Sequence, residues 1–575
     1  MKIKIKNIPL LVAILFSLFS IAKEYAQIPA FPGAEGYGAT ASGGRGGVVF
    51  EVTTLDDDAV SPPAGSLRAA LKDTTTKPRT IVFRVSGIIE LKGRLDVGQQ
   101  NITIAGQTAP GDGICLKNYP MKVYGKNIII RYIHFRPGDL THSNSPAIYG
   151  IDCENARNVI VDHCSVSWAI EENATFYDNK YTTFQWSIIS ESLKNSYNTK
   201  GAHGYAGVWG GQYASYHHNL IAHNDSRNPR FNGARAHDTI AVVDFRNNVI
   251  YNWASNSAYG GEIEIKNGIS NINMVANYYK YGPATSSSKK NRIINPSDTA
   301  FISKPGVMSK WYIADNYVDG YPAITADNWS GGVQPQDSRY GGAAAFKADS
   351  PFQTAAVNTQ KAEDAYADVL KYAGASFPMR DTIDLRIVTN AKNRTAGAKN
   401  GIIDSQTDVN GWCAYNNATP PVDSDHDGMP DSWEIANGLN PNDPLDGVKT
   451  DSQGYTMLEN YLNSLVSYQF PLAVNETHTM VADEYRLYNN YPNPFNPETT
   501  ITYYIPKTSA VHIVIYNLLG QQVEELVNTV ENPGRHSIAF SGRNLSSGIY
   551  FCYLKAASVD GTKAFTDANK LILLK

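Results

Sequence analysis

The chain has 575 residues, of which 42% are hydrophobic and 18% are charged, and its formal net charge is −4 at pH 7. This hydrophobic content is enough for a large core and excludes a wholly disordered chain. The low charge, together with 46 Gly and 35 Tyr, argues for a turn-rich, mostly β protein rather than a helical bundle. The charge gives no overall basic field, so nucleic acid is not an expected partner. Five Cys residues are too few, and odd in number, for a disulfide framework.

Residues 1–26 have the pattern of a secretory signal peptide. Lys2, Lys4 and Lys6 form a basic start, and an almost unbroken apolar stretch follows at residues 8–22. This stretch is shorter than the ~20 apolar residues that a membrane-spanning helix needs, so we expect cleavage between Ala22 and about Gln27 rather than an uncleaved anchor. The mature protein is therefore expected to be exported.

A short pattern recurs from residue 100 to about 320: a few β-forming residues, then polar residues, then β-formers again. Examples are residues 101–105, 127–135, 158–166 and 240–250. Repeats that begin roughly 23–40 residues apart, with connections of varying length, are typical of a solenoid. A β-propeller would show a steadier period, and a βαβ sheet would need amphipathic helices between the strands. The sequence predicts an all-β fold with a right-handed parallel β-helix over residues 27–415; an irregular β-sandwich is the alternative.

Two local features accompany this pattern. Asn residues recur at the rung corners, where we expect them to satisfy the backbone groups of the turns. Residues 66–71 (SLRAAL) predict a short helix that covers the open end of the coil stack.

Several motifs in this region resemble the family 1 pectate lyases. They are residues 31–38 (FPGAEGYG), 65–71, 81–87, 127–138, 158–168 and, most clearly, 216–231 (YHHNLIAHNDSRNPRF). They occur in order over roughly residues 30–320. The resemblance implies a parallel β-helix enzyme that cleaves polygalacturonate, the backbone of pectin, by β-elimination with Ca²⁺. A hard cation on the uronate carboxylate would withdraw charge while the neighbouring C5 proton is removed.

The acidic residues of the central rungs are candidate ligands for this ion. Asp152, Glu171 and Glu172 are the residues we select, and a solvated rung edge is the alternative for each. The family usually presents an acidic pair four residues apart, and Ala174 stands where the second acid would be expected. The ligand set therefore departs from the family pattern.

Residues 225–235 contain three arginines and one aspartate, which makes a local basic site in a mildly acidic protein. The resemblance implies that Arg227, in an Arg-x-Pro motif, removes the C5 proton. Because arginine is normally protonated, with a pKa above roughly 12, neighbouring cations would have to disfavour its charge. Arg230 and Arg235 are candidate clamps for uronate carboxylates, since a planar guanidinium suits such groups. Asn232 stands where family members often have another arginine.

Lys200 and His203 lie one rung earlier, in the segment KGAHGY. They are candidate substrate contacts, and a loop position without such a role is the alternative.

A second calcium site is predicted in the segment 416–468. Residues 423–434 match the Asp-x-Asp-x-Asp-Gly-x5-Glu loop, whose oxygen ligands would be Asp423, Asp425, Asp427, Asp431 and Glu434. Pro421 argues against a helix entering the loop, so we expect a structural staple rather than a paired calcium sensor. Residues 454–462 predict a helix that packs beside it.

After a linker at 469–484, residues 485–575 contain short alternating strands separated by Gly and Asn turns, which predicts a small β-sandwich. The segment resembles the C-terminal sorting domain of type IX secretion substrates; a carbohydrate-binding module is the alternative. The resemblance implies the type IX machinery as a partner and export to the cell surface or the medium.

Taken together, the sequence predicts a secreted, calcium-dependent and monomeric pectate lyase. A β-helix hydrolase of the polygalacturonase type would need paired Asp acids around an inverting water. A non-catalytic surface adhesin would not need the arginines at 227–235. Residues 320–415 lack the rung pattern, and we interpret them as an extended loop region along the substrate cleft.

Overall fold

The structure is a computed structural model that describes residues 28–73, 78–140, 148–297, 308–336 and 341–466 and, in the C-terminal part, 485–487, 490, 495–518, 520–532, 534–561 and 564–574. The predicted signal peptide and the predicted linker at 469–484 lie outside these residues. The chain divides into two compact units between Ala473 and Val474. Each unit is described by itself.

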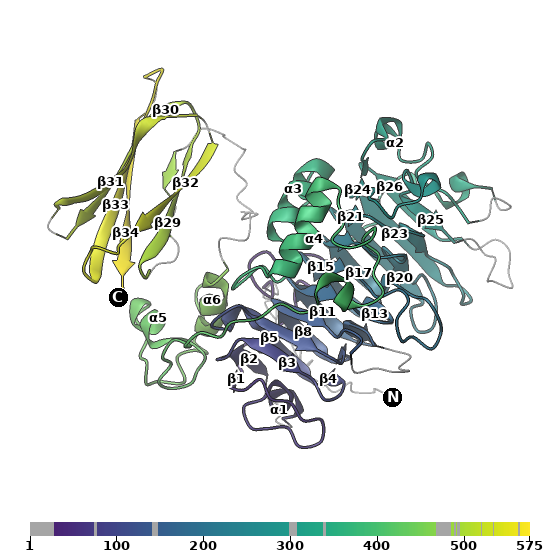
Figure 1. Cartoon of the computed structure of the whole chain (residues 1–575), viewed down its shortest axis with the longest axis horizontal. Coiled ribbons are helices and arrows are strands. Elements are labelled where there is room, and N and C mark those ends of the chain that lie inside the picture. The colour runs from purple at the N-terminus through teal and green to yellow at the C-terminus, as the bar shows by residue number, and fades with distance from the viewer. Residues whose placement is uncertain are drawn as a thin grey trace, which may run out of the picture. The chain divides into compact units, whose positions relative to one another are not determined.

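The first unit is a coil of three parallel sheets, A, B and C, each running along the coil axis (Figure 1). Sheet A contains β1 (Val48–Val52), β2 (Arg79–Phe83), β5 (Gln100–Ala105), β8 (Lys126–Arg131), β11 (Arg157–Asp162), β14 (Lys180–Gln185), β17 (Gln212–His217), β20 (Ile240–Arg246), β23 (Ile269–Val275) and β26 (Lys310–Ala314). Sheet B contains β3 (Gly87–Glu90), β6 (Ile114–Lys117), β9 (Ile133–Arg136), β12 (Ser165–Ser167), β15 (Ile188–Ser190), β18 (Leu220–Ala222), β21 (Val249–Tyr251), β24 (Tyr278–Lys280) and β27 (Tyr317–Val318). Sheet C contains β4 (Leu95–Val97), β7 (Met121–Val123), β10 (Ile151–Glu154), β13 (Glu172–Tyr177), β16 (Tyr205–Trp209), β19 (Arg230–Phe231), β22 (Ala258–Gly260) and β25 (Ile294–Pro296). The predicted right-handed parallel β-helix is confirmed.

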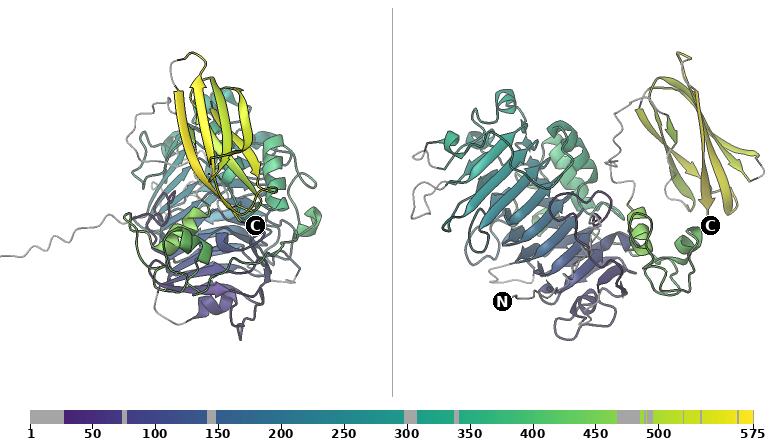
Figure 2. Two further views of the ribbon diagram at one scale, coloured as in Figure 1. Left: turned by 90° about the vertical axis from the view of Figure 1, so that its left-hand side faces the viewer. Right: turned by 180° about the vertical axis from the view of Figure 1, so that it is seen from behind.

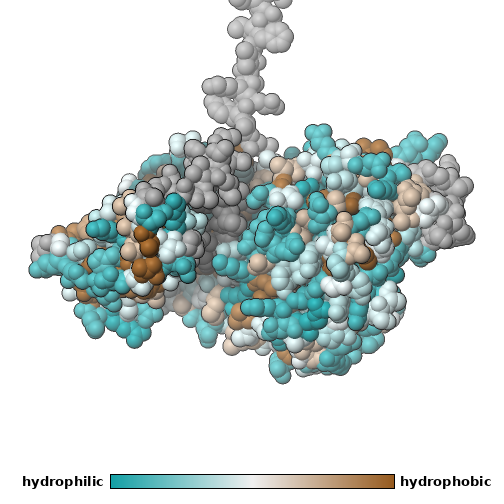
Figure 3. Space-filling view, turned by 90° about the horizontal axis from the view of Figure 1, so that it is seen from above, coloured by the Kyte–Doolittle hydropathy of each residue, from teal (hydrophilic) through white to brown (hydrophobic). Residues whose placement is uncertain are grey.

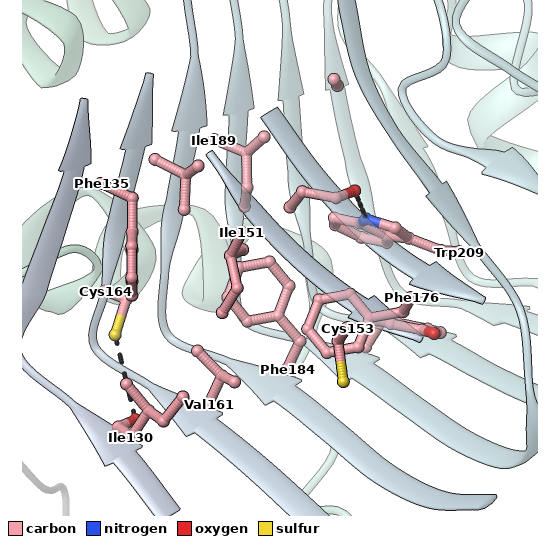
Figure 4. Close-up of a cluster of buried hydrophobic side chains, with 14 of the residues drawn as sticks. Ile130, Phe135, Ile151, Cys153, Val161, Cys164, Phe176, Phe184, Ile189 and Trp209 are labelled. Atoms are coloured by element: carbon pink, nitrogen blue, oxygen red, sulfur yellow. Dashed lines mark hydrogen bonds between the residues drawn. The ribbon is translucent and has the colours of Figure 1, made fainter. Parts of the chain in front are cut away.

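One hydrophobic core fills the inside of the coil. Side chains of strands from all three sheets converge there, as Figure 4 shows for several neighbouring rungs. Phe176 and Phe184 stack with ring centroids 5.0 Å apart. The indole nitrogen of Trp209 donates to the Ala174 carbonyl at 3.1 Å, so this large side chain is buried without an unpaired donor. Alternate residues of each short strand therefore supply the core, and the others face outward.

Asparagines form a ladder inside the turn between sheets A and B. Asn248 Oδ1 accepts from the backbone nitrogen of Asn219 at 3.0 Å, and Asn277 Oδ1 accepts from that of Asn248 at 2.9 Å. Asn316 continues the ladder, with its Oδ1 2.9 Å from the Asn277 nitrogen. All four are fully buried. The predicted role of Asn at rung corners is confirmed, because each amide satisfies backbone groups of the adjacent turn.

The N-terminal Gly-rich segment covers the outer face of sheet A. Gly38 donates its backbone N–H to Thr183 Oγ1 at 2.9 Å, and Gly44 does the same to Thr103 Oγ1 at 2.9 Å. A Cβ at Gly38 would lie 2.2 Å from the Val159 carbonyl oxygen, which is sterically impossible. These glycines therefore allow close backbone approach and do not form a phosphate-binding loop.

Helix α1 (Leu67–Lys72) lies where residues 66–71 predict a capping helix. The hydroxyl of Ser66 accepts from the backbone nitrogen of Ala69 at 3.2 Å and so caps its first turn. Leu67 and Leu71 join the N-terminal end of the hydrophobic core.

The interpretation of residues 320–415 as an extended cleft loop is wrong. They include α2 (Pro322–Ala326), α3 (Ala362–Tyr372) and α4 (Thr382–Asn393). Helices α3 and α4 pack their apolar faces on sheet B, where Val369 and Ile387 meet Leu220 and Tyr251 (Figure 1). The N-cap Asp381 of α4 accepts from the backbone nitrogen of Asp384 at 2.9 Å and also contacts the buried Arg136 of β9. These contacts hold the helices on sheet B rather than on sheet C.

The predicted calcium-loop segment belongs to the same compact unit. It contains α5 (Asp431–Ala436) and α6 (Met457–Ser464). Helix α6 has the predicted position and begins with a capping box made by Thr456 and Glu459. Leu458 and Leu462 of α6 pack with Met429 against Val82 and Ala105 of sheet A. Figure 2 shows α6 beside the N-terminal strands of the coil.

The second unit is a sandwich of two antiparallel sheets, which confirms the predicted β-sandwich. One sheet contains β28 (Arg486–Leu487), β29 (Glu498–Ile505) and β32 (Gly534–Ser541), and the other contains β30 (Ser509–Asn517), β31 (Gln522–Glu531), β33 (Gly548–Ser558) and β34 (Ala564–Leu573). Inward residues of both sheets, including Ile501, Ile513 and Leu554, form a core separate from that of the coil. In the described parts of the chain, no helix combines the length and hydropathy that a membrane crossing requires.

Candidate active site

Sheet C carries a row of outward-facing residues at the same level of successive strands. Parallel pairing aligns Lys122 with Asp152, Asp152 with Thr175, Thr175 with Val208, and Val208 with Arg230. Aligned residues of a parallel sheet face the same side. Stacking of rungs therefore brings Asp152 and Arg230, which are far apart in the sequence, into one row.

A groove of about 530 Å³ opens along this row. Its lining includes the predicted residues Asp152, Glu171, Glu172, Arg230 and Arg235. The other lining residues are Arg94, Pro120, Lys122, Tyr149, Glu154, Thr175, Tyr177, Val208 and Asn232. The groove thus combines carboxylates with cations, as binding of a calcium ion and an acidic chain would require.

Asp152 lies near one end of the row and is nearly buried. Its carboxylate is 3.0 Å from the Nζ atom of Lys122, which also contacts Glu154. Burial raises the pKa of Asp152, and Lys122 partly opposes this effect. Lys122 and Glu154 were missed from the sequence. Glu154 could have been found, because a residue two positions after Asp152 faces the same side of a strand.

Glu171 is held by the segment that follows β15. It lies 2.7 Å from Lys200 Nζ and 3.5 Å from His203 Nε2, and its Oε2 accepts from Asn198 Nδ2 at 2.6 Å. Lys200 is half exposed, whereas His203 is nearly buried. Both residues thus reach a candidate calcium ligand, and their role as substrate contacts stays a prediction.

Arg227 follows the residue that bridges to Tyr205 of β16. Its φ angle of 56° is left-handed, which is uncommon for a residue with a Cβ. The backbone is fixed on both sides: Gly207 donates to the Arg227 carbonyl at 3.0 Å, and Asn228 donates to the Ser257 carbonyl at 2.8 Å. A conformation held in this way is a frequent property of functional positions.

The Arg227 side chain points to the acidic side of the groove. Its Nη1 contacts Glu172, and its guanidinium carbon lies 4.1 Å from the centroid of the Tyr205 ring. The structure therefore brings together the predicted base and one predicted calcium ligand. Tyr205 was not singled out from the sequence; its pairing with Glu172 on β13 places it there.

Arg230 and Arg235 have acidic partners on the next rung. Arg230 Nη2 lies 3.3 Å from Glu262, and Arg235 Nη2 lies 2.9 Å from Glu264. One oxygen of Glu262 is buried without a hydrogen-bond partner. The side chains of Arg227, Arg230 and Arg235 are 19%, 21% and 22% exposed. Arg230 and Arg235 line the groove, whereas Arg227 is not a lining residue and meets the groove through its contact with Glu172.

Comparison with known proteins places the chain in a family. The "Probable pectate lyase C" proteins of Aspergillus flavus and Aspergillus fumigatus are each 36% identical to this chain, over 466 and 463 residues, which cover 79% of this chain and 97% of those proteins. The chain belongs to the pectate lyase family. "Probable pectate lyase 12" of Arabidopsis thaliana is 33% identical over 154 residues, 23% of this chain and 29% of that protein.

Two further comparisons concern the fold and the C-terminal unit. The cedar pollen allergen Jun a 1 matches with a TM-score of 0.43 and 19% identity, over 59% of this chain and 92% of its own. A mutant Bacillus subtilis pectate lyase matches with a TM-score of 0.34 and 14% identity, over 61% and 98%. These scores are low, so the fold assignment rests on the three parallel sheets.

Residues 489–566 match the model described as the secretion system C-terminal sorting domain, which confirms that predicted resemblance.

In this pectate lyase, the position five residues after Arg227 is buried. Asn232 is fully buried, and its Nδ2 lies 3.5 Å from a carboxylate oxygen of Asp238. Burial and the neighbouring Asp178 raise the pKa of Asp238 to about 7. Family members often have an arginine at this position. Here Asn232 and its neighbour Asp238 stand instead, and neither side chain can carry a positive charge.

Several oxygen donors lie along the groove, although the described residues form no close group of three acids there. Asp152, Glu154, Glu171 and Glu172 supply carboxylates, and the buried hydroxyl of Thr175 has no hydrogen-bond partner. Hard oxygen donors of this kind are the ligands that Ca²⁺ prefers. Each of the four acids contacts a cationic side chain: Lys122, Lys200 or Arg227.

Acidic groups also converge closely in the predicted calcium loop. Carboxylate oxygens of Asp423, Asp425 and Asp427 lie within 4.8 Å of one another, as do those of Asp427, Glu434 and Asp446. Burial and the neighbouring carboxylates raise the pKa of Glu434 to about 8. Asp446 was missed because it lies outside the loop motif.

Asp431 takes a different position in this loop. Both of its oxygens accept from Ser424, one from the backbone nitrogen and one from the hydroxyl, each at 2.7 Å. It also occupies the first turn of α5. Its role as a ligand stays a prediction, and a bridging water would be needed, as is frequent at this loop position.

Proposed function

We propose that this member of the pectate lyase family cleaves polygalacturonate by β-elimination in the groove of sheet C. The observation that carries the proposal is the contact of Arg227 with Glu172, a lining residue of a groove that arginines and other carboxylates also line. Arg227 takes the proton from C5 of a uronate, the electron pair forms the C4–C5 double bond, and the C4–O4 bond breaks. The glycosidic oxygen leaves with that bond pair and is then protonated.

Calcium is the cofactor in this proposal, with Asp152, Glu154, Glu171 and Glu172 as its candidate ligands. When bound, a calcium ion would draw charge from the uronate carboxylate and make the C5 proton more acidic. The protein residues supply the remaining functions: they bind the acidic chain, orient C5 towards Arg227, and receive the proton.

The contact between Arg227 and Glu172 links the base to a candidate calcium ligand. A calcium ion bound by Glu172 would compete with Arg227 for this carboxylate, so we expect the contact to loosen when the ion is bound. Glu172 is thus both a candidate ligand and the partner that Arg227 must leave to reach C5.

Arg230 and Arg235 serve as clamps for uronate carboxylates. Their guanidinium groups lie on the same side of sheet C as Asp152 and can form paired hydrogen bonds to a carboxylate. Because Glu262 and Glu264 already contact them, a substrate carboxylate must compete with these acids.

The test compares the wild type and Arg227→Lys on polygalacturonate. Product is measured by the absorbance of the C4–C5 double bond at ~235 nm, with and without a chelator that removes calcium. Lysine keeps the charge but loses the planar guanidinium, so we expect kcat to fall about 10²–10⁴-fold while substrate binding is largely kept. Arg230→Lys should mainly raise KM. Arg157→Lys, an exposed position on sheet A, is the matched control.

Near-normal kcat in Arg227→Lys would overturn the assignment of the base. New reducing ends without ultraviolet absorbance in the wild type would indicate a hydrolase of the polygalacturonase type. Binding of the polymer with no new chain ends would indicate an adhesin.

We also propose a route of export for this enzyme, which the match of residues 489–566 to a sorting domain supports. The enzyme is exported by type IX secretion, acts as a monomer, and reaches the cell surface or the medium. Deletion of residues 485–575 should leave the enzyme inside the producing cell, which fractionation and immunoblotting would show. Normal export of the shortened chain would contradict this role.

A further inference from the structure

Five acidic side chains form two overlapping groups beside α5, and one of them comes from outside the predicted loop. Asp423, Asp425, Asp427 and Glu434 belong to the loop, and Asp446 follows twelve residues after its last position. Asp427 belongs to both groups of acids within 4.8 Å, so it joins Asp446 to the loop. The loop motif alone does not predict this neighbour.

The side chains in this cluster lack the partners that buried carboxylates require. Glu434 is 0% exposed, and neither of its oxygens has a hydrogen-bond partner. Asp446 is 1% exposed, and its Oδ1 also has none. A buried carboxylate without compensation is strongly unfavourable. Buried, unpartnered carboxylate oxygens that lie within 4.8 Å of one another in each group indicate a site for a cation.

The segment that carries Asp446 is pressed against the loop. A Cβ at Gly447 would lie 2.5 Å from Asp427 Oδ2, so any larger residue here would displace that carboxylate. Asp446 is also oriented by its Oδ2, which accepts from the backbone nitrogen of Asn440 at 2.8 Å. This leaves Oδ1 free to act as a ligand.

The same segment is bound to helix α6. The Gly447 carbonyl accepts from the backbone nitrogen of Leu458 at 3.1 Å, and the Lys449 carbonyl accepts from that of Met457 at 2.8 Å. Leu458 in turn packs with Met429 on sheet A. An ion held by the loop and by Asp446 would therefore connect the loop, the segment 446–449 and α6.

We propose that Asp446 is a ligand of a calcium ion in the loop 423–434, and that this ion fastens α6 to sheet A. The proposal extends the predicted structural calcium site and does not depend on the reaction in the groove. Calcium fits better than magnesium because a site with five carboxylates can supply the six to eight oxygen ligands that Ca²⁺ accepts, whereas Mg²⁺ usually keeps several waters.

The test uses the full chain and compares Asp446→Asn with Asp443→Asn. Asp443 lies in the same segment, is 39% exposed, and contacts Lys449 rather than the cluster. Tb³⁺ is bound in place of calcium and excited through Trp433, which is adjacent to Glu434, and calcium then displaces it. We expect Asp446→Asn to weaken calcium binding at least ~10-fold and to remove most of the calcium-dependent rise in Tm. Asp443→Asn should behave like the wild type.

Wild-type calcium affinity and Tm rise in Asp446→Asn would overturn the proposal, as would a wild-type Tm that does not respond to chelator. If Asp446→Asn does not fold, a crystal structure of the wild type with calcium decides. An Asp446 oxygen within ~2.3–2.6 Å of the ion supports the proposal, and an ion without that contact overturns it. Glu172→Gln should leave the Tb³⁺ emission sensitised by Trp433 unchanged. This control shows that the emission reports the ion in the loop and not an ion in the groove.

Discussion

At the scale of single residues, the groove is defined by pairs of opposite charge. Glu172 contacts Arg227, Glu262 contacts Arg230, and Lys122 contacts Asp152. Every one of these pairs joins residues on different rungs. The partner of each side chain is therefore as important to its chemistry as the side chain itself.

Removal of the acid beside Arg230 should strengthen substrate binding. Glu262→Gln keeps the shape of the side chain but removes its negative charge, so a uronate carboxylate no longer competes for Arg230. We expect KM for polygalacturonate to fall about 2- to 10-fold with little change in kcat. Steady-state kinetics measure both values. An unchanged or higher KM would show that Glu262 instead holds Arg230 in its productive position.

Asp238 should make stability depend on pH. Its pKa is raised to about 7 by burial and by Asp178. The folded state therefore holds this proton more tightly than the unfolded state, and stability falls as pH rises from about 4 to about 7 and then levels. Asp238→Asn cannot ionise, so its Tm relative to wild type should increase from pH 5 to pH 8. A Tm difference that is the same at both pH values would contradict this assignment.

At the scale of the elements, the stacking of rungs positions the residues of the site. The asparagine ladder between sheets A and B holds successive rungs in register. The strands of sheet C are short, and β19 has only two residues. Such strands cannot fix their register alone, so the turns must do so. The buried asparagines between sheets A and B supply that register, because each amide bonds to the next rung.

Loss of one asparagine from this ladder should destabilise the whole coil. In Asn248→Ala, the Tyr216 carbonyl and the Asn219 backbone nitrogen both lose their partner inside the protein. Each unsatisfied buried group costs about 1–3 kcal/mol, so we expect a clear loss of stability and a lower Tm. Asn271→Ala, at a half-exposed position on β23, is the matched control. Equal Tm values for the two variants would show that the ladder contributes nothing specific.

At the scale of the whole molecule, the enzyme and the sorting domain have separate cores. Tyr503, Ile513 and Leu554 lie in the core of the second unit, and none of them belongs to the core of the coil. In the face shown in Figure 3, hydrophilic side chains predominate and hydrophobic ones are scattered, as is usual for protein surfaces.

Removal of the second unit should leave the enzyme folded and active. A chain that ends at Ala473 keeps α6 and the buried Val466 and loses only the sorting sandwich. We expect its kcat on polygalacturonate and its Tm in calcium to match those of the full chain within error. A shortened chain that is insoluble or inactive would show that the boundary is misplaced. A chain that ends at Leu465 would lose Val466, so we expect a lower Tm for it.

Much of this architecture is determined by the sequence alone. The rung pattern, the recurrent asparagines and the loop at 423–434 act over a few residues, so they can be recognised without a structure. The helix α3 could also have been found, because Ala362, Ala365 and Val369 recur at helical spacing. The position of this helix on sheet B, rather than along the cleft, could not have been predicted. It depends on contacts between distant parts of the chain, such as that of Arg136 with Asp381.

The composition of the site was decided only by the tertiary structure. Glu262 beside Arg230, Lys122 beside Asp152 and Asp446 beside Asp427 follow no local motif. Each depends on which residues of successive rungs or loops come into register, and register is set by stacking and turn length summed over many residues. The sequence therefore indicated which residues are candidates for the chemistry, and the fold decided which charge each of them faces.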